Sequence, residues 1–350
     1  MADGSYERRE VAHARSRMVQ AMRDDFQREA FLEVETPLLV PAPGMEPHIT
    51  AFEAGFVPET SHARAQKLYL HTSPEYAMKR LLADGFKRIF SICKVFRNGE
   101  VARDHNPEFS MLEFYRADAT YELIMDDVER LVGEAARKLE KPYAVRPDAK
   151  GRPQRVRLWD EFERLTVRDA VKRRTGLDIY DFLDDASAFA NAARAIGIQI
   201  SENATSFDDV FFTVFLDRVE RTLGWDRPTF LVDYPRSQAS LARIKPGDAR
   251  VAERFELYVA GVELCNGFSE LTDAKEQRLR LEEEQQQRRD AGRAVYPLDE
   301  RFLEAVGRMP SAGGVAVGLD RLLMLLLGKR SIAEVLLFPA FEFVGQGDAP

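Results

Sequence analysis

The chain has 350 residues, of which 45% are hydrophobic and 31% charged, and its formal net charge at pH 7 is −8. This composition is typical of a globular protein, and no apolar run approaches the ~20 residues that span a bilayer. Two cysteines and five histidines, none in paired spacing, argue against a disulfide framework and a zinc site. The acidic balance argues against nucleic acid as the main partner, since phosphate contacts need basic side chains. The N-terminus is charged from Glu7 onward and lacks an apolar signal core, so we expect a cytoplasmic protein without membrane contact.

The first predicted elements are a helix, a strand and a second helix. Residues 7–30 place apolar side chains at three- and four-residue steps, which indicates an amphipathic helix (Val11, Ala14, Met18, Met22 and Phe26). Residues 31–37 alternate apolar and acidic side chains as a half-buried strand does, and Pro37 ends it. Residues 121–139 predict a helix capped by Thr120. One face of this helix is apolar (Leu123, Ile124, Val128, Leu131, Val132 and Ala135).

The remaining segments suggest the organisation of a single domain over residues 1–350. Residues 141–153 are rich in Pro, Lys and Arg and predict a surface connection. Residues 155–225 predict a helical insertion, to which we assign no chemistry. Residues 276–293 predict a charge-dense, solvated helix. Because strands and helices are interspersed without a regular βαβ rhythm, we predict an α+β fold with an antiparallel sheet flanked by helices.

Two familiar nucleotide-binding motifs are missing from the sequence. It contains no Gly-x-Gly-x-x-Gly after a strand, and Gly328-Lys329 lacks the upstream glycine of a Walker loop. A polyphosphate would therefore be held by arginines and by carboxylate-bound magnesium.

The first candidate segment for this chemistry is residues 96–115, which predict a strand, a polar loop and a returning strand. Arg97 lies at the end of the outgoing strand, and Glu113 and Tyr115 share one face of the returning strand. Such a hairpin brings a guanidinium, a carboxylate and a phenol around one small ligand. The alternative is a charged surface hairpin.

Two further candidate segments carry carboxylates and an arginine. In residues 261–271, Glu263 and Glu270 flank Asn266-Gly267, a pair that favours a tight turn, so the carboxylates suit magnesium or an ammonium group. The alternative is a solvated turn. In residues 313–321, glycines precede an apolar helix with Arg321 in its first turn, where a cation gains nothing from the helix dipole. This position suggests an anionic ligand; the alternative is an exposed arginine on a buried helix.

Together these segments resemble the signature motifs of class II aminoacyl-tRNA synthetases. Residues 31–39 are similar to motif 1, the Arg97 hairpin to motif 2, and Gly318-x-Asp320-Arg321 to motif 3. Residues 72–75 with 78–80, 105–109 and 266–271 resemble the lysyl branch, and the resemblance covers residues 10–340. It implies the class II catalytic fold and a homodimer, because the motif 1 proline lies at the dimer interface in that family.

The arrangement also resembles a shorter group within this branch. In lysyl-tRNA synthetases an anticodon-binding β-barrel precedes motif 1, whereas only about thirty residues precede it here, so we expect that module to be absent. The chain is similar to the elongation factor P–(R)-β-lysine ligases in residues 235–241 and 250–256 and at Ser73 and Ala316. This resemblance implies ATP-dependent activation of (R)-β-lysine, or lysine, as an adenylate. The acyl group then passes to a lysine side chain of elongation factor P, and tRNA is not expected as a partner.

The resemblance also implies roles for individual residues. Arg97 and Arg321 are the catalytic residues, since Arg97 contacts the substrate carboxylate and the α-phosphate, and Arg321 the γ-phosphate and the adenine opposite Phe109. Tyr115 and Glu270 take the distal ammonium, and Glu75 and Glu113 the other amino group. The substrate-binding set is Ser73, Pro74, Glu75, Glu113, Tyr115, Asn266, Glu270 and Ala316. The ATP-binding set is Arg97, Asn98, Gly99, Glu100, Arg103, Asn106, Phe109, Glu263, Leu264, Gly318 and Arg321. Glu263 and Glu270 hold Mg²⁺.

One departure and two alternatives stay open. The family often has a glutamate directly after Arg-Asn, whereas Gly99 comes first here and Glu100 second, so the residue that reads the adenine or ribose is not assigned. One alternative is a tRNA-charging lysyl enzyme without its anticodon domain. The other is a non-catalytic regulatory paralogue, which predicts loss of the catalytic arginines, whereas Arg97, Arg103 and Arg321 are present.

Overall fold

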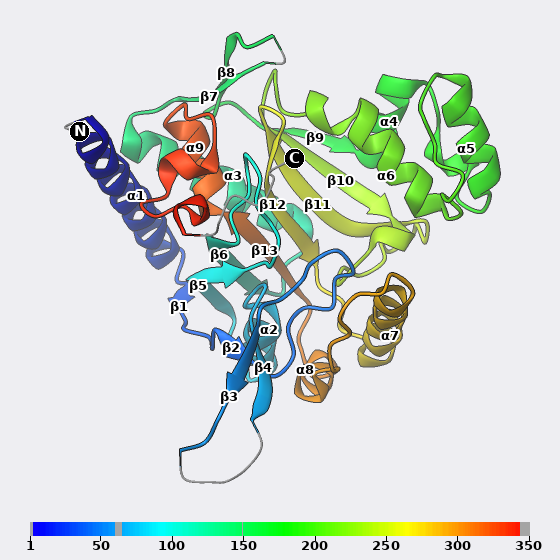
Figure 1. Cartoon of the computed structure of the whole chain (residues 1–350), viewed down its shortest axis with the longest axis horizontal. Helices are drawn as coiled ribbons and strands as arrows, with labels where there is room; N and C mark the ends of the chain where they lie inside the picture. Colours follow the sequence, from blue (N-terminus) through cyan, green and yellow to red (C-terminus); the bar gives the residue numbers. More distant parts are fainter. Residues whose placement is uncertain (1–2, 60–64, 149, 344–350) are drawn as a thin grey trace.

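The centre of the molecule is an eight-stranded sheet with the order β1-β5-β6-β13-β12-β11-β10-β9 (Figure 1). The computed structural model describes residues 3–59, 65–148 and 150–343. The strands of this sheet are β1 (Leu32–Glu33), β5 (Arg88–Phe96), β6 (Glu108–Ala117), β9 (Glu163–Thr166), β10 (Thr229–Pro235), β11 (Val251–Val259), β12 (Val262–Ser269) and β13 (Ala312–Gly318). The inner pairs are antiparallel, whereas the edge strands β1 and β9 are parallel to their neighbours. The predicted α+β class is confirmed.

Three helices cover one face of the sheet, which we call the rear face: α1 (Asp3–Arg28), α3 (Tyr121–Leu139) and α9 (Leu319–Leu326). The predicted helix over 7–30 ends at Arg28, and the helix over 121–139 has the predicted ends. Thr120 is the N-cap residue of α3, although its side chain makes no capping hydrogen bond. Leu123 was expected on the apolar face but is 38% exposed, because it lies in the first turn and points away from the sheet.

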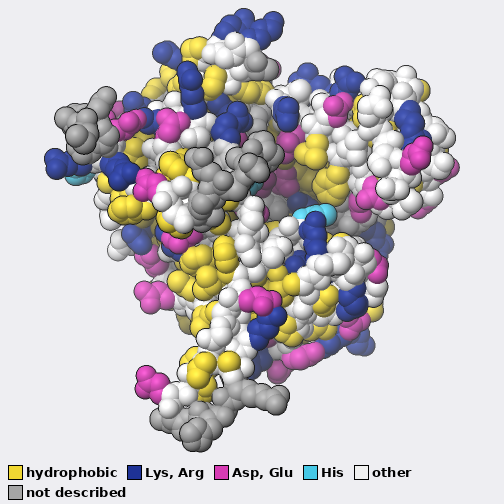
Figure 2. Space-filling view, in the orientation of Figure 1, with side chains coloured by type: hydrophobic (Ala, Val, Ile, Leu, Met, Phe, Trp, Pro, Cys, Tyr) yellow, Lys and Arg dark blue, Asp and Glu magenta, His cyan; other side chains and the backbone are white. Residues whose placement is uncertain are grey.

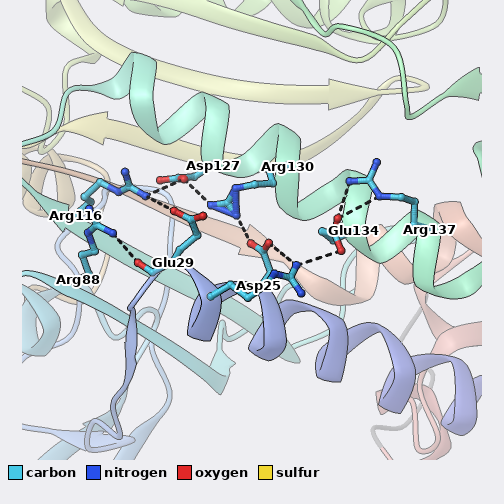
Figure 3. A network of polar contacts seen from close by, with 9 residues as sticks. Asp25, Glu29, Arg88, Arg116, Asp127, Arg130, Glu134 and Arg137 are labelled. Carbon is cyan, nitrogen blue, oxygen red and sulfur yellow. Dashed lines mark hydrogen bonds and ion pairs between the residues drawn. The ribbon is translucent and has the colours of Figure 1, made fainter.

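A network of ion pairs joins α1 to α3 on the rear face (Figure 3). Asp25 of α1 contacts Arg130 of α3, and Arg130 Nη2 lies 2.6 Å from Oδ1 of Asp127. Asp127 also accepts from Arg116 of β6 at 3.1 Å. The remaining members are Arg28, Glu29, Glu134 and Arg137, and Arg88 donates to the carbonyl of Glu29. The four carboxylates and four of the arginines therefore balance across this packed interface.

The opposite face, which we call the front face, is covered only in part. The elements there are α2 (Glu75–Ala83), α7 (Ala274–Asp290), α8 (Glu300–Val306) and a small sheet of β2 (Leu39–Val40), β4 (Gln66–Leu70) and β3 (Glu53–Phe56). Met78 and Leu82 of α2 pack against Tyr115 and Met309, which fixes α2 beside one end of β6. Near the other end of β6, the backbone N–H of Ser110 donates to Oδ2 of Asp320 in α9 at 2.7 Å.

Residues 155–225 were expected to form a helical insertion, but they begin with strands. Their helices are α4 (Val167–Thr175), α5 (Ala186–Ala195) and α6 (Phe207–Arg218), and they share a core with β10 and β11. Figure 1 shows these helices at the β9–β10 end of the sheet, across the molecule from α1. Short 3-10 helices are η1 (Ile179–Asp181), η2 (Glu220–Thr222), η3 (Arg236–Gln238), η4 (Ile332–Val335) and η5 (Ala340–Glu342).

The connection predicted over 141–153 contains a hairpin of β7 (Tyr143–Pro147) and β8 (Pro153–Arg157). It projects from the body of the molecule (Figure 1), and Lys and Arg side chains gather on it in Figure 2. Its paired residues Ala144 of β7 and Val156 of β8 are fully buried, so one side of the hairpin is packed, which the polar composition did not indicate.

Three further expectations were wrong in detail. Residues 31–37 form only the two-residue strand β1, at the sheet edge, where Leu32 is 54% exposed. Asn266-Gly267 makes no turn, because β12 runs straight through both residues and pairs with β11 and β13. A side chain at position 267 would meet the Phe255 ring at 2.5 Å, so packing explains that glycine. The charge-dense helix α7 is not solvated all round, because its Arg288 is fully buried.

Candidate active site

The strand register gathers the predicted site residues on the front face. Glu113 of β6 lies opposite Ala316 of β13, Ala316 opposite Asn266 of β12, and Asn266 opposite Glu256 of β11. Paired residues point to the same face, so this row crosses the middle of the sheet. The next row toward α2 is Tyr115, Gly314, Phe268 and Arg254.

A β-bulge in β12 adds one more carboxylate to this face. Leu257 pairs with Cys265, but Tyr258 pairs with Glu263, so Leu264 is an extra residue between them. Because a bulge reverses the alternation of side chains, Glu263 shares the face of Asn266 and Glu270. Without the bulge its side chain would point to the rear face.

The middle of the site is built around Glu113. Its carboxylate, 1% exposed, accepts hydrogen bonds from the hydroxyls of Ser73 and Tyr115, each at 2.7 Å. Ser73 Oγ in turn accepts from the backbone N–H of Glu75 at 3.0 Å. Burial, with a smaller contribution from Glu75, raises the pKa of Glu113 to about 8. A nearby cation favours the ionised form of a buried carboxyl group with a raised pKa, so Glu113 suits an ammonium ligand.

The end of the site next to α2, which we call the amine end, holds a lysine that sequence analysis did not assign. Lys79 is fully buried, and its Nζ lies 2.6 Å from Glu75 Oε1 and 2.7 Å from Glu270 Oε2. Burial raises the pKa of Glu270 to about 7, although Lys79 opposes that shift. The sequence signals for Lys79 are its place four residues after Glu75 on one helix and its place within residues 78–80, which resemble the lysyl branch.

Several buried polar atoms of the site have no hydrogen-bond partner among the described residues. They include the amide oxygen of Asn266, Oε1 of Glu270 and Nε of Arg97. Gly314 lies so close that a side chain there would meet Glu270 Oε1 at 2.6 Å and the Tyr115 ring at 2.3 Å. Buried polar groups are nearly always paired, so these atoms indicate a ligand site.

The other end of the site, which we call the phosphate end, carries the loop that begins at Arg97. The Arg97 guanidinium lies over the Phe109 ring, 5.2 Å from its centroid, and 3.8 Å from Glu100. Gly99 has a φ of +86°, a conformation that favours glycine, which explains its place before Glu100. Asn98 N donates to the carbonyl of Thr50 at 2.7 Å and ties the loop to the segment before β3.

Arg321 is held in place by the protein at the same end. It donates to the carbonyls of Glu263 at 2.9 Å and Asp104 at 3.2 Å, and its Nη2 lies 2.8 Å from His105 Nε2. Arg103 is mostly exposed on the loop. The structure therefore brings Arg97, Arg321, Phe109, Glu263 and Gly318 to one end, as a nucleotide site requires.

Asn106, for which an ATP contact is expected, also makes two hydrogen bonds to backbone. Its amide nitrogen donates to the carbonyl of Glu108 at 2.6 Å, and its amide oxygen accepts from the backbone N–H of Ala340 at 2.9 Å. Both ends of the side chain are thus bonded to backbone, which holds the loop against the C-terminal segment.

The expected magnesium pair is separated in the structure. Glu263 and Glu270 lie at opposite ends of β12, and seven residues of extended chain span roughly 20 Å, so one ion cannot contact both. Glu270 also pairs with Lys79. Glu256 is instead the neighbour of Glu263: burial and then the Glu256 carboxylate raise the pKa of Glu263 to about 7, while Arg321 and Arg97 oppose the shift. No cluster of three or more His, Cys, Asp or Glu side chains suited to a metal occurs among the described residues.

Comparison with known proteins identifies the family of this chain. Residues 5–342 match the sequence profile of the tRNA synthetases class II (D, K and N). The chain belongs to this class II synthetase family. Membership of this family implies the use of ATP, so the predicted use of ATP is confirmed at the level of the family.

Individual relatives within the family are more specific. The chain is 40% identical over 326 residues to elongation factor P–(R)-β-lysine ligase of Klebsiella pneumoniae (strain 342), covering 93% of both chains. It is 40% identical over 330 residues to the protein of that name from Proteus mirabilis (strain HI4320), covering 94% of both. The Salmonella paratyphi B (strain ATCC BAA-1250 / SPB7) protein of that name is 38% identical over 326 residues. Among the described residues, no helix is long and apolar enough to cross a membrane.

Proposed function

We propose that this protein is a ligase that activates (R)-β-lysine with ATP and transfers it to a lysine side chain of elongation factor P. The observation that carries the proposal is the acidic amine end joined to the arginine-rich phosphate end on one face of the sheet. Glu75, Glu113 and Glu270 supply three carboxylates, and Lys79 supplies one cation. When all three carboxylates are ionised, two negative charges remain, which suits the two ammonium groups of a diamino acid. The names of the relatives point to the same substrate and acceptor.

The proposed reaction has two steps. The substrate carboxylate attacks the α-phosphorus of ATP and pyrophosphate leaves, with Arg97 and Arg321 stabilising the charge that develops on the phosphate oxygens. The lone pair of an acceptor lysine ε-amino group then attacks the acyl carbon. AMP leaves, the nitrogen loses a proton, and an amide forms. No protein nucleophile takes part in either step.

The middle row of the site is assigned to the reacting end of the amino acid. Ala316 lies opposite Glu113, and Ser73 is bonded to it, so all three stand between the amine end and the phosphate end. Tyr115 and Glu270 serve the distal ammonium. Pro74 precedes α2 and directs Glu75 toward the same pocket.

Magnesium is assigned to Glu256 and Glu263 in place of the pair expected from the sequence. Both carboxylates are on the front face at the phosphate end, beside Arg321 and Arg254. Oxygen ligands of this kind suit Mg²⁺, which also takes phosphate oxygens and water. The ion would neutralise charge on the triphosphate when bound there.

The whole chain is proposed to act as one catalytic unit in a homodimer, with residues 155–225 as an appendage to the sheet. The dimer proposal rests on the apolar side chains exposed along the β1–β2 segment, Leu32, Leu38 and Leu39, which are 54%, 40% and 42% exposed. Apolar surface of this kind is often covered by a partner. A light-scattering mass near the 39.8 kDa of one chain at micromolar concentration would contradict the dimer.

A labelling experiment tests the function. The protein is incubated with ATP, labelled (R)-β-lysine or lysine, and either elongation factor P or bulk tRNA. We expect label on elongation factor P and none on tRNA. Label on tRNA alone would indicate the tRNA-charging alternative, and no adenylate with either amino acid would indicate the regulatory paralogue.

A further inference from the structure

The buried ammonium of Lys79 stands inside the pocket that is proposed to recognise ammonium groups. Its Nζ contacts Glu75 at 2.6 Å and Glu270 at 2.7 Å, and lies 6.0 Å from the ring centroid of Phe302. Glu75 begins α2, whereas Glu270 follows the end of β12. Lys79 therefore joins a helix to the central sheet through two carboxylates that face the substrate.

The carboxylate of Glu270 has an oxygen left for a ligand. Lys79 contacts Oε2 of Glu270, and Oε1 of Glu270 has no hydrogen-bond partner among the described residues. That free oxygen lies beside Tyr115, since a side chain at Gly314 would touch both. One carboxylate oxygen of Glu270 thus contacts Lys79, and the other is left for the substrate.

We propose that Lys79 is a positioning residue that bridges Glu75 and Glu270, keeps them from sharing a proton and thereby fixes the selection of an amino acid with two ammonium groups. This inference rests on the proposed function. It assigns Lys79 no contact with the substrate and no part in bond formation. Its effect passes through the two carboxylates.

The alternative state without Lys79 can be deduced from the same contacts. Glu75 and Glu270 both contact one nitrogen, so in its absence they repel each other in a buried place and take up a proton between them. With a shared proton, the two carboxylates have the same net charge that they have together with Lys79. The proton nevertheless occupies an oxygen that the substrate needs. Although burial opposes its charge, ion pairs with Glu270 and Glu75 raise the pKa of Lys79, so its ammonium is permanent over the working pH range.

Other titratable groups face this pair from every element packed around it. They are Glu46 on the segment before β3, Tyr76 on α2, Glu113 and Tyr115 on β6, and Glu284 on α7, with Arg97 and Arg288 close to Glu46. All of them remain when Lys79 is replaced. A change that appears only in the variant therefore reports on the Glu75–Glu270 pair.

The test compares Lys79→Met, which keeps the length of the side chain, with Lys79→Ala and with the exposed control Lys275→Met. The assay is amino-acid-dependent pyrophosphate exchange at about pH 6.5 and about pH 8.5. In Lys79→Met we expect the KM for β-lysine to rise about tenfold or more at the lower pH, because a buried acceptor is lost. This rise should shrink at the higher pH, where the shared proton leaves. The KM for ATP should stay within about twofold of wild type, as should both KM values of Lys275→Met.

Chemical rescue distinguishes loss of the positioning charge from general damage to the fold. In Lys79→Ala, added methylammonium should restore a low KM for β-lysine, because a small cation can enter the space left by the lysine side chain. Equal rises in both KM values, a pH-independent rise, or absence of rescue would overturn the proposal. If Lys79→Ala does not fold, the pH dependence of Lys79→Met decides by itself. Absence of exchange in the wild-type protein with every diamino acid would instead refute the proposed function, and this inference with it.

Discussion

The two faces of the central sheet differ in how many cations the protein supplies to their carboxylates. On the rear face, Asp25, Asp127, Glu29 and Glu134 are matched by four arginines across α1, α3 and β6. On the front face, Glu75, Glu113 and Glu270 share one protein cation, Lys79. Burial raises the pKa of Glu113 to about 8 and that of Glu270 to about 7. Each rear carboxylate therefore has an arginine partner from the protein, whereas the front carboxylates outnumber their one cation.

This difference separates stability from function. A buried carboxylate that lacks a cation destabilises the folded protein, and the penalty is removed when a cationic ligand binds. The rear carboxylates already have their cations and gain nothing from substrate. Substitutions on the rear face should therefore change the free energy of unfolding, and those on the front face should change substrate affinity and rate.

The largest effect is expected for Arg97→Ala at the phosphate end. Arg97 Nε has no hydrogen-bond partner among the described residues, so its donors are free for the α-phosphate and the carboxylate. We expect pyrophosphate exchange to fall by at least about 10²-fold, with the melting temperature close to wild type. Arg155→Ala on the exposed face of β8 is the matched control and should keep its activity. Near-normal exchange by folded Arg97→Ala would refute the assignment of this end.

On the rear face, Asp127→Ala should lower the free energy of unfolding by about 2–4 kcal/mol, because Arg116 and Arg130 each lose a buried partner. Urea unfolding measures this value. The KM values for ATP and β-lysine should not change. A changed KM with unchanged stability would reverse the comparison between the two faces.

A smaller effect is expected for Ala316→Gly in the middle row of the front face. Its methyl group stands beside Glu113, where the position of the reacting amino group differs between α- and β-lysine. Removing it should raise the relative kcat/KM for α-lysine by an amount equivalent to about 1–3 kcal/mol. Competition between the two amino acids in the exchange assay measures the ratio. An unchanged ratio, or a wild-type preference for α-lysine, would show that selectivity lies elsewhere.

Parts of this account could be predicted from the sequence because the signals were local. The 3.6-residue period and the flanking residues gave both ends of α3, and alternation along β6 placed Glu113 and Tyr115 on one face. The sequence also predicted the glycines before α9 and the position of Arg321 in its first turn.

The remainder depended on contacts between distant segments. Asn266-Gly267 has strong turn propensity, but pairing on both sides and the Phe255 ring over Gly267 keep β12 extended. The bulge that turns Glu263 to the front face is a register shift between two strands, which composition does not reveal. Lys79 was missed because a lysine on an amphipathic helix is usually exposed, and only the fold shows it buried between carboxylates.

Calorimetric titration with (R)-β-lysine near pH 7, in two buffers of different ionisation enthalpy, tests the central claim most directly. In the empty pocket the raised pKa values keep Glu113, and part of the Glu270 population, protonated near this pH. A bound ammonium lowers those pKa values, so binding should release protons into the buffer, and Glu113→Gln should release fewer. Norleucine, which lacks the distal ammonium, should bind more weakly and release fewer protons. Tight binding of β-lysine with no proton release in either buffer would contradict the account of an acidic pocket completed by its substrate.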